Sequence, residues 1–165
     1  MSERHREQDT LGAIQQLQYK YPFATALLIY CLIERMVKYF VIKERMNSRP
    51  ILDKSWCLSL RSMSDIDLNE ELTERNLTFG RLAHKFNSKA YKRTFKGIAR
   101  RRNKYMHSKD LFPPFVNLKA EKRSKIHKAD LLKAIKDLKT TLIKLKDIYE
   151  LEIDQDGMIC GFHQR

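Results

Sequence analysis

Residues that build turns are scarce in this chain, which holds only 5 glycines and 4 prolines among 165 residues, while 32% of its residues are charged. Turn-rich β architectures need more glycine and proline than this, so the composition favours helices with solvated charged faces. A chain of this length supports one sizeable core. The sequence therefore predicts an all-α fold in a single domain spanning residues 1–165, with its core at about residues 10–150 and a tail at 151–165.

Cysteine is equally sparse, and its pattern excludes two classes of protein. Cys31, Cys57 and Cys160 are odd in number and widely spaced, and they include no CxxC pair. A disulfide framework and a structural zinc site are both excluded by this pattern. We expect a reducing compartment, no metal site and no cofactor.

Long apolar runs are also lacking. The longest, Ala26 to Ile33, has eight residues and stops at Glu34, whereas a membrane-spanning helix needs roughly 20. The first ten residues carry charges with no apolar segment behind them, so they do not form a secretory signal. The sequence predicts a cytoplasmic protein that does not insert into a membrane.

Acidic residues are missing between Asn76 and Lys109, in a chain whose net charge is +13. Positive charge this concentrated indicates a surface that binds phosphates, most often those of nucleic acid. The alternative is a solvated basic helix balanced by acidic residues packed nearby. The basic block consists of Arg81, Lys85, Lys89, Lys92, Arg93, Lys96, Arg100, Arg101, Arg102, Lys104 and Lys109. The acidic stretch consists of Asp65, Asp67, Glu70, Glu71 and Glu74.

Hydrophobic spacing and the breakers between segments predict about five helices. Asp9 or Thr10 is the expected N-cap of the first helix. A long connection with room for one short helix is expected between residues 48 and 72, and Asp156-Gly157 marks a turn in a tail that forms either a small hairpin or a loose end. Four of the expected helices span about residues 11–19, 22–45, 78–86 and 88–106. The fifth is a long amphipathic helix near the end of the chain. That last helix is marked by Leu131, Ile135, Leu138, Leu142, Leu145 and Tyr149 at four-three spacing.

One arginine occupies a core position in this pattern. The inward residues of the 88–106 helix fall four and three apart, and Arg102 takes the place in that series between Ile98 and Tyr105. An unpaired buried charge is very costly, so Arg102 must snorkel, pair with an acid or line a cleft. Glu34 is the candidate acid, although Glu34 and Lys38 can also form only a helix-stabilising i, i+4 pair.

Motifs of the common hydrolases and nucleotide-binding proteins are absent, since no glycine-rich phosphate loop, HExxH or GxSxG occurs. What remains is Arg102, Asn103, three further residues and then His107, although Arg100 and Arg101 also lie within the same spacing window of His107. This pattern resembles the R-x4-6-H motif of the HEPN family of ribonucleases in its common R-N-x-x-x-H form. The apolar segment CLIERMVKYF with its glutamate, and the short TFGRL segment, are also similar to that family, over about residues 22–150.

Helical geometry places Asn103 and His107 on one face, whereas Arg102 and His107 point about 140° apart. The resemblance implies a four- to five-helix up-and-down bundle that dimerises, so that two motifs meet in a composite cleft. It also implies metal-independent RNA cleavage, in which the ribose 2′-hydroxyl attacks the adjacent phosphate. Some members are toxins or defence effectors, for which an antitoxin protein would be the partner.

Each motif residue has a role in that chemistry. Histidine titrates near neutral pH, so His107 can transfer protons, while Arg102 would stabilise the phosphoryl oxygens and Asn103 would orient the imidazole. Glu34 would support Arg102. The expected RNA-binding residues are Lys96, Arg100, Arg101, Lys104 and Lys109.

Other interpretations stay open. His107 can instead favour the last carbonyls of its helix, and Arg102 can be a purely structural partner of Glu34. The protein would then be a catalytically silent bundle that binds RNA or a protein through its basic face. Peripheral membrane binding through the lysine-rich last helix is less favoured, because its apolar face is the best candidate for the core. Family members controlled by adenylylation carry a tyrosine where this chain has Lys109, so that control is not expected.

Overall fold

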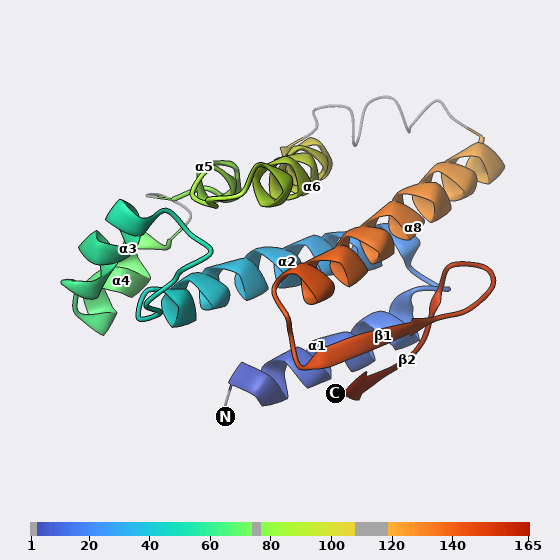
Figure 1. The fold of residues 1–165 in the computed structure, drawn as a ribbon. Helices are drawn as coiled ribbons and strands as arrows, with labels where there is room; N and C mark the ends of the chain where they lie inside the picture. The colour runs from blue at the N-terminus through green and yellow to red at the C-terminus, as the bar shows by residue number, and fades with distance from the viewer. Residues whose placement is uncertain (1–2, 74–76, 108–118) are drawn as a thin grey trace. The chain divides into compact units, whose positions relative to one another are not determined.

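A computed structural model of the chain describes residues 3–73, 77–107 and 119–165, and this described part holds seven helices and two strands (Figure 1). The protein is mostly helical and has a long helix near its C-terminus, as the sequence predicted, followed by a small hairpin that an all-α class does not contain. The elements are α1 Glu3–Leu17, α2 Pro22–Glu44, α3 Lys54–Arg61, α4 Asp65–Glu71, α5 Phe79–Ala83, α6 Lys89–His107, α8 Ala120–Lys144, β1 Tyr149–Ile153 and β2 Ile159–Gln164.

The internal contacts divide the chain into two compact units. Unit 1 comprises Met1–Ile33 and Tyr105–Arg165, and unit 2 comprises Glu34–Lys104. The boundaries fall within α2 and α6, so each of these helices supplies residues to both units.

The core of unit 1 is built on the apolar side of α8. Leu131, Ile135, Leu138 and Leu142 of this helix are all buried, which confirms the predicted stripe. The predicted extension of the helix to Tyr149 is wrong. The helix ends at Lys144 because Lys146 adopts a positive φ of 52°, a left-handed conformation that ends an α-helix.

Helix α1 begins earlier than the capping residues suggested. The Thr10 hydroxyl donates to the carbonyl of Arg6 at 2.6 Å, a bond within the helix, so Thr10 does not act as an N-cap. The helix starts at Glu3, and it buries Leu11 and Ile14.

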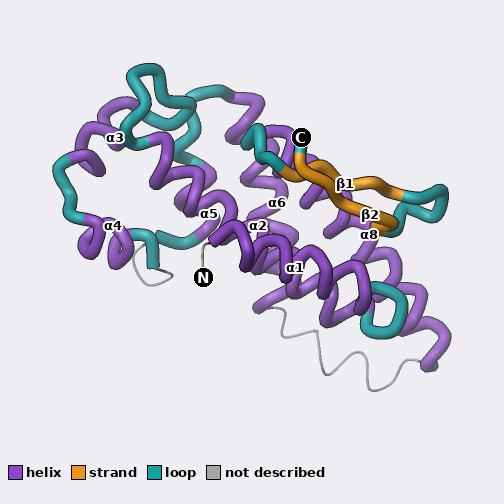
Figure 2. Tube along the Cα trace, turned by 90° about the horizontal axis from the view of Figure 1, so that it is seen from below, coloured by secondary structure: helices purple, strands orange, loops and turns teal. Residues whose placement is uncertain are grey.

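The tail forms an antiparallel hairpin, in which Leu151 lies opposite Phe162. The Asp154 carboxylate accepts from the backbone N–H groups of Asp156 and Met158 at 2.9 Å each, and Gly157 supplies the positive φ of 82° that the turn requires. Strand β1 packs beside α8 and β2 beside α1 (Figure 2).

Two glutamine side chains bond to the hairpin: Gln15 of α1 donates to the carbonyl of Cys160 at 2.9 Å, and Gln18, the residue after α1, bonds to Ile159. The Gln18 amide donates to the carbonyl of Ile159 at 2.6 Å and accepts from its N–H at 2.9 Å. Gln18 is 1% exposed, so both bonds are shielded from water. Its amide group therefore pairs with the outer edge of β2 as a neighbouring strand would.

Unit 2 has an aromatic core. Phe86 stacks on Phe95 with 4.6 Å between ring centroids, and Phe40 of α2 lies on Phe86 at 6.3 Å. A bridge between Leu52 and Phe86 ties the connection after α2 to the residues that precede α6.

The segment 48–72 contains two short helices, not one. The Asp53 carboxylate accepts from the N–H of Trp56 to cap α3, and the Ser64 hydroxyl accepts from the N–H of Asp67 to cap α4. Both caps were visible in the sequence, but helices of 8 and 7 residues are too short to show a repeated apolar spacing.

No helix in the described ranges is long and apolar enough to cross a bilayer.

Candidate functional site

Helix α6 carries the motif, and its inward side is set by the spacing of apolar residues. Phe95 and Ile98 on this side are 0% and 1% exposed. Arg102, one turn further along, is 7% exposed. Its spacing predicted an inward position, and the structure places it there.

Glu34 of α2 is the acid that meets this buried guanidinium. Nη2 of Arg102 lies 2.5 Å from Oε2 of Glu34, and the two side chains are only 9% and 8% exposed. The second oxygen of Glu34 accepts from Nζ of Lys38 at 3.1 Å. One buried carboxylate thus meets two cations, and in the low dielectric of the interior these attractions are stronger than at a surface.

The neighbouring Asn103 extends this polar group toward solvent. Nη1 of Arg102 donates to Oδ1 of Asn103 at 3.2 Å, and Asn103 is exposed. A guanidinium has donors only, so the amide oxygen must face it and the NH2 group of Asn103 must face elsewhere. The NH2 group is therefore left to donate elsewhere, and the oxygen keeps a second lone pair that can accept another bond.

The structure brings together Glu34, Arg102 and Asn103 of the predicted site and adds Lys38 to them. His107 is the last residue of α6, and its side chain lies outside the described part of the structure. Lys109 lies outside the described residues altogether. Of the three adjacent arginines, Arg102 is buried, whereas Arg100 and Arg101 are exposed.

The solvent side of α6 carries a row of cations, which we call the basic stripe. Its members are spaced four, three, four and four residues apart, so they share one face of the helix. All are exposed except Lys96, which is half-buried. The basic stripe consists of Lys89, Arg93, Lys96, Arg100 and Lys104.

Arg101 lies beside this row, and its side chain folds back along the helix. A Cβ placed at Gly97 would be 3.5 Å from Nη1 of Arg101, so the guanidinium covers the surface that a glycine leaves open. In the acidic stretch, Asp65 pairs with Arg45, the residue that follows α2, at 2.6 Å. Asp65 therefore balances a cation at the C-terminal end of α2.

Metal-ligating side chains are dispersed in the part of the chain that the structure describes, where no group of three or more histidine, cysteine, aspartate or glutamate residues could hold an ion.

In comparisons with known proteins, no family model, no curated protein and no solved structure matches the chain. The resemblance to the HEPN family therefore depends on the motif residues and the two short similar segments alone.

Proposed function

We propose that this protein is a metal-independent endoribonuclease of the HEPN type, whose active site is completed in a homodimer. The observation that carries the proposal is the buried Arg102, which is held by Glu34 at 2.5 Å and contacts the exposed Asn103 at 3.2 Å. A charged residue fixed in this way, at the arginine position of an R-N-x-x-x-H motif, is pre-organised for binding an anion. The same proposal includes the arrangement of the main helices, which would form a four- to five-helix up-and-down bundle with the short helices as additions to it.

Arg102 would act at the phosphate. Its bond to Glu34 is buried, whereas its bond to Asn103 is partly exposed. The Nη1 end is therefore the end that a phosphate oxygen would reach. Glu34 is a positioning residue, which holds the other end of the guanidinium and offsets the cost of burying its charge.

Asn103 and His107 would act together at the ribose. An amide oxygen has two lone pairs, so Oδ1 of Asn103 would accept from the N–H of the His107 imidazole, one turn along the helix, as well as from Arg102. That bond would leave the unprotonated nitrogen of His107 directed at the substrate, where it can take up the proton of the 2′-hydroxyl.

The proposed reaction is a transesterification. The 2′-oxygen forms a bond to phosphorus as its proton passes to a general base, the bond from phosphorus to the 5′-oxygen breaks, and that oxygen takes up a proton. The products are a 2′,3′-cyclic phosphate and a free 5′-hydroxyl. His107 from one or both subunits would transfer the protons, and Arg102 would stabilise the negative charge on the phosphoryl oxygens.

The basic stripe would bind the RNA backbone. Five cations on one face of a helix match a run of phosphates, and their binding releases counterions. A cytoplasmic ribonuclease of this kind would act as a toxin or defence effector, and an antitoxin protein would restrain it.

A second function is favoured by the same ion pair. A buried arginine joined to a glutamate on another helix holds two helices together without any chemistry, and the basic stripe would then serve binding alone. The alternative is a catalytically silent helical bundle that binds RNA or a protein partner.

The two functions are separated by incubating the purified protein with single-stranded RNA in EDTA. We expect shortened RNA with 2′,3′-cyclic phosphate ends, and we expect His107→Ala to slow cleavage by about two to four orders of magnitude. Arg102→Ala should do the same. The matched control is Arg100→Ala, which removes an exposed arginine two residues away and should weaken binding while leaving the limiting rate nearly unchanged. RNA that is bound but never shortened would favour the silent bundle.

A further inference from the structure

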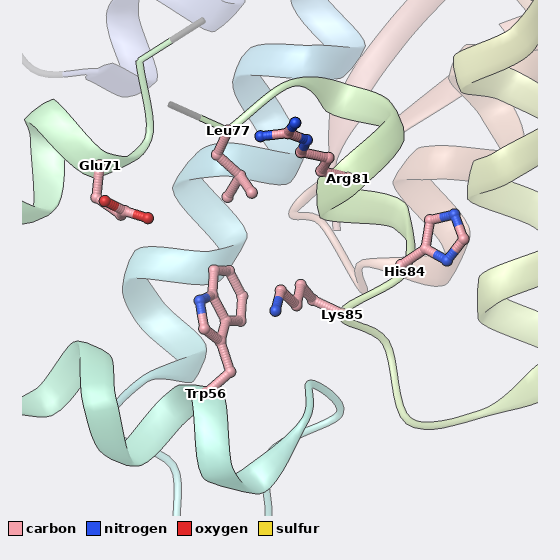
Figure 3. A pocket seen from close by; sticks show the side chains of 6 residues that line it. All are labelled: Trp56, Glu71, Leu77, Arg81, His84 and Lys85. Carbon is pink, nitrogen blue, oxygen red and sulfur yellow. The ribbon is translucent and has the colours of Figure 1, made fainter. Parts of the chain in front are cut away.

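A cavity in unit 2 is lined by none of the residues of the Arg102 cluster. It has a volume of about 380 Å³, within the range of ordinary small-ligand pockets. Figure 3 shows the indole of Trp56 at the lower side of the group, with the ammonium of Lys85 directed at it from one side and Glu71 lying on the other side. The lining residues are Trp56, Glu71, Leu77, Arg81, His84 and Lys85.

The aromatic ring of this cavity is held in place before any ligand arrives. The backbone N–H of Trp56 donates to the Asp53 carboxylate at 2.8 Å, which fixes the start of α3. Nζ of Lys85 lies 5.4 Å from the ring centroid, where a cation is attracted to the electron-rich face. Trp56 is only half-buried, so part of the ring stays accessible to a ligand.

The charges around the ring match the parts of a nucleotide. Arg81 is exposed and Lys85 half-exposed, and both can bind a phosphate. The Glu71 carboxylate is an acceptor only, so it suits the N–H groups at the edge of a nucleobase and repels a phosphate. The long side chain of Lys85 can turn from the indole to the phosphate when a base takes its place on the ring.

The position of the cavity in the chain favours RNA as the source of that nucleotide. Arg81 and Lys85 are the first two cations of the acid-free segment that runs on into the basic stripe of α6. An aromatic platform next to a track of cations is the usual means of binding single strands, because every base has a face that can stack.

We propose that the Trp56 cavity binds one unpaired nucleotide of single-stranded RNA, with its base against the indole and its phosphate on Arg81 and Lys85. The inference depends on the RNA ligand of the proposed function but not on cleavage, since a silent RNA-binding bundle would use the cavity in the same way.

Trp56 is the only tryptophan of the chain, so tryptophan fluorescence reports on this cavity alone. The full-length protein is titrated with a short 2′-O-methyl single-stranded RNA, which lacks the attacking hydroxyl and cannot be cut. We expect saturable quenching, and little or none with a duplex of the same sequence or with a free nucleoside monophosphate at matched concentration. Quenching by the monophosphate as strong as by the RNA would overturn the proposal in favour of a small-molecule site.

Affinity is measured in parallel from the fluorescence anisotropy of an end-labelled oligonucleotide. Trp56→Ala should weaken binding by about 5- to 150-fold, the range expected for the loss of one stacked base. Arg81→Ala should lower the slope of log affinity against log salt by about 0.7, the contribution of one phosphate contact on a single strand. The matched control is Arg49→Ala, another exposed arginine of unit 2 that does not line the cavity, which should leave the slope unchanged.

The results distinguish the two proposals. RNA binding without quenching of Trp56, with Arg81→Ala equal to Arg49→Ala, would overturn the cavity and leave the basic stripe intact. Quenching by the 2′-O-methyl RNA, together with no cleavage of unmodified RNA in EDTA, would support the cavity and count against the ribonuclease.

Discussion

Neutralising Glu34 should destabilise the protein more than removing Arg102, although the two residues form one ion pair. Glu34→Gln leaves Arg102 charged with a side chain that is only 9% exposed, and the neutral Asn103 does not replace the lost charge. Breaking a buried pair from one side costs about 3–5 kcal/mol. We expect about 3 kcal/mol, the lower end, because the glutamine oxygen can still accept from the guanidinium.

The opposite substitution, Arg102→Met, leaves Glu34 with a second cation. Nζ of Lys38 remains 3.1 Å from the carboxylate. The methionine side chain occupies the space of the arginine side chain without bringing a charge into the interior. The loss should therefore be smaller by at least about 1 kcal/mol. In the double variant no unpaired arginine remains, so its loss should fall short of the sum of the two single losses by about 1–3 kcal/mol.

Urea unfolding measures these free energies, with tryptophan fluorescence as the signal, because Trp56 and the ion pair belong to the same unit. Losses that add within about 0.5 kcal/mol would refute the coupling. A loss for Arg102→Met equal to that for Glu34→Gln would refute the compensating role of Lys38. If the folded double variant still cut RNA at the parent rate, Arg102 would have no part in catalysis.

Four further outcomes are expected. Gln18→Leu leaves the N–H and carbonyl of Ile159 without their side-chain partner at a buried site, which should cost about 1–3 kcal/mol for each group and speed hydrogen exchange at that amide. Burial raises the pKa of the Cys57 thiol above its ordinary value, helped by the nearby Glu44, so iodoacetamide should label it far more slowly than the two exposed cysteines. Since that pKa is raised by folding, the associated stability is complete below the pKa of the unfolded thiol and is lost as the pH rises through the folded value, which alkaline thermal scans would show. Sedimentation at tens of micromolar should give a dimer, and a strictly monomeric mass would contradict the composite site. RNA affinity should fall steeply with salt, and Arg100→Ala should flatten that dependence, whereas salt-insensitive binding would remove the role of the basic stripe.

Long amphipathic patterns made the main helices predictable from the sequence. The four-three spacing of α8 continues over several turns, and its leucines and isoleucine are buried as expected. The same reasoning placed Arg102 inward on α6. The pattern extended α8 too far, because a hydrophobic Tyr149 in register looks the same whether the backbone is helical or has already turned into β1.

Partners distant in sequence were harder to predict. Glu34, 68 residues before Arg102, was the candidate acid and does meet it, but helical spacing identifies only which residues face inward and not which of them meet. Lys38 was visible only as an i, i+4 neighbour of Glu34. The Trp56 cavity joins α3 to residues near α5 and gives no local signal, because its aromatic ring and its cations come from different segments.

The way unit 1 is assembled has a consequence for how the protein is made. Its two segments come from opposite ends of the chain, so on the ribosome α1 emerges long before the hairpin whose Ile159 holds Gln18. At about 5–20 residues per second, the interval lasts several seconds. During that time Leu11 and Ile14 lack part of the packing that buries them in the finished protein. Translation that stops before β2 would therefore release a fragment with this apolar side exposed, which chaperones and proteases would recognise.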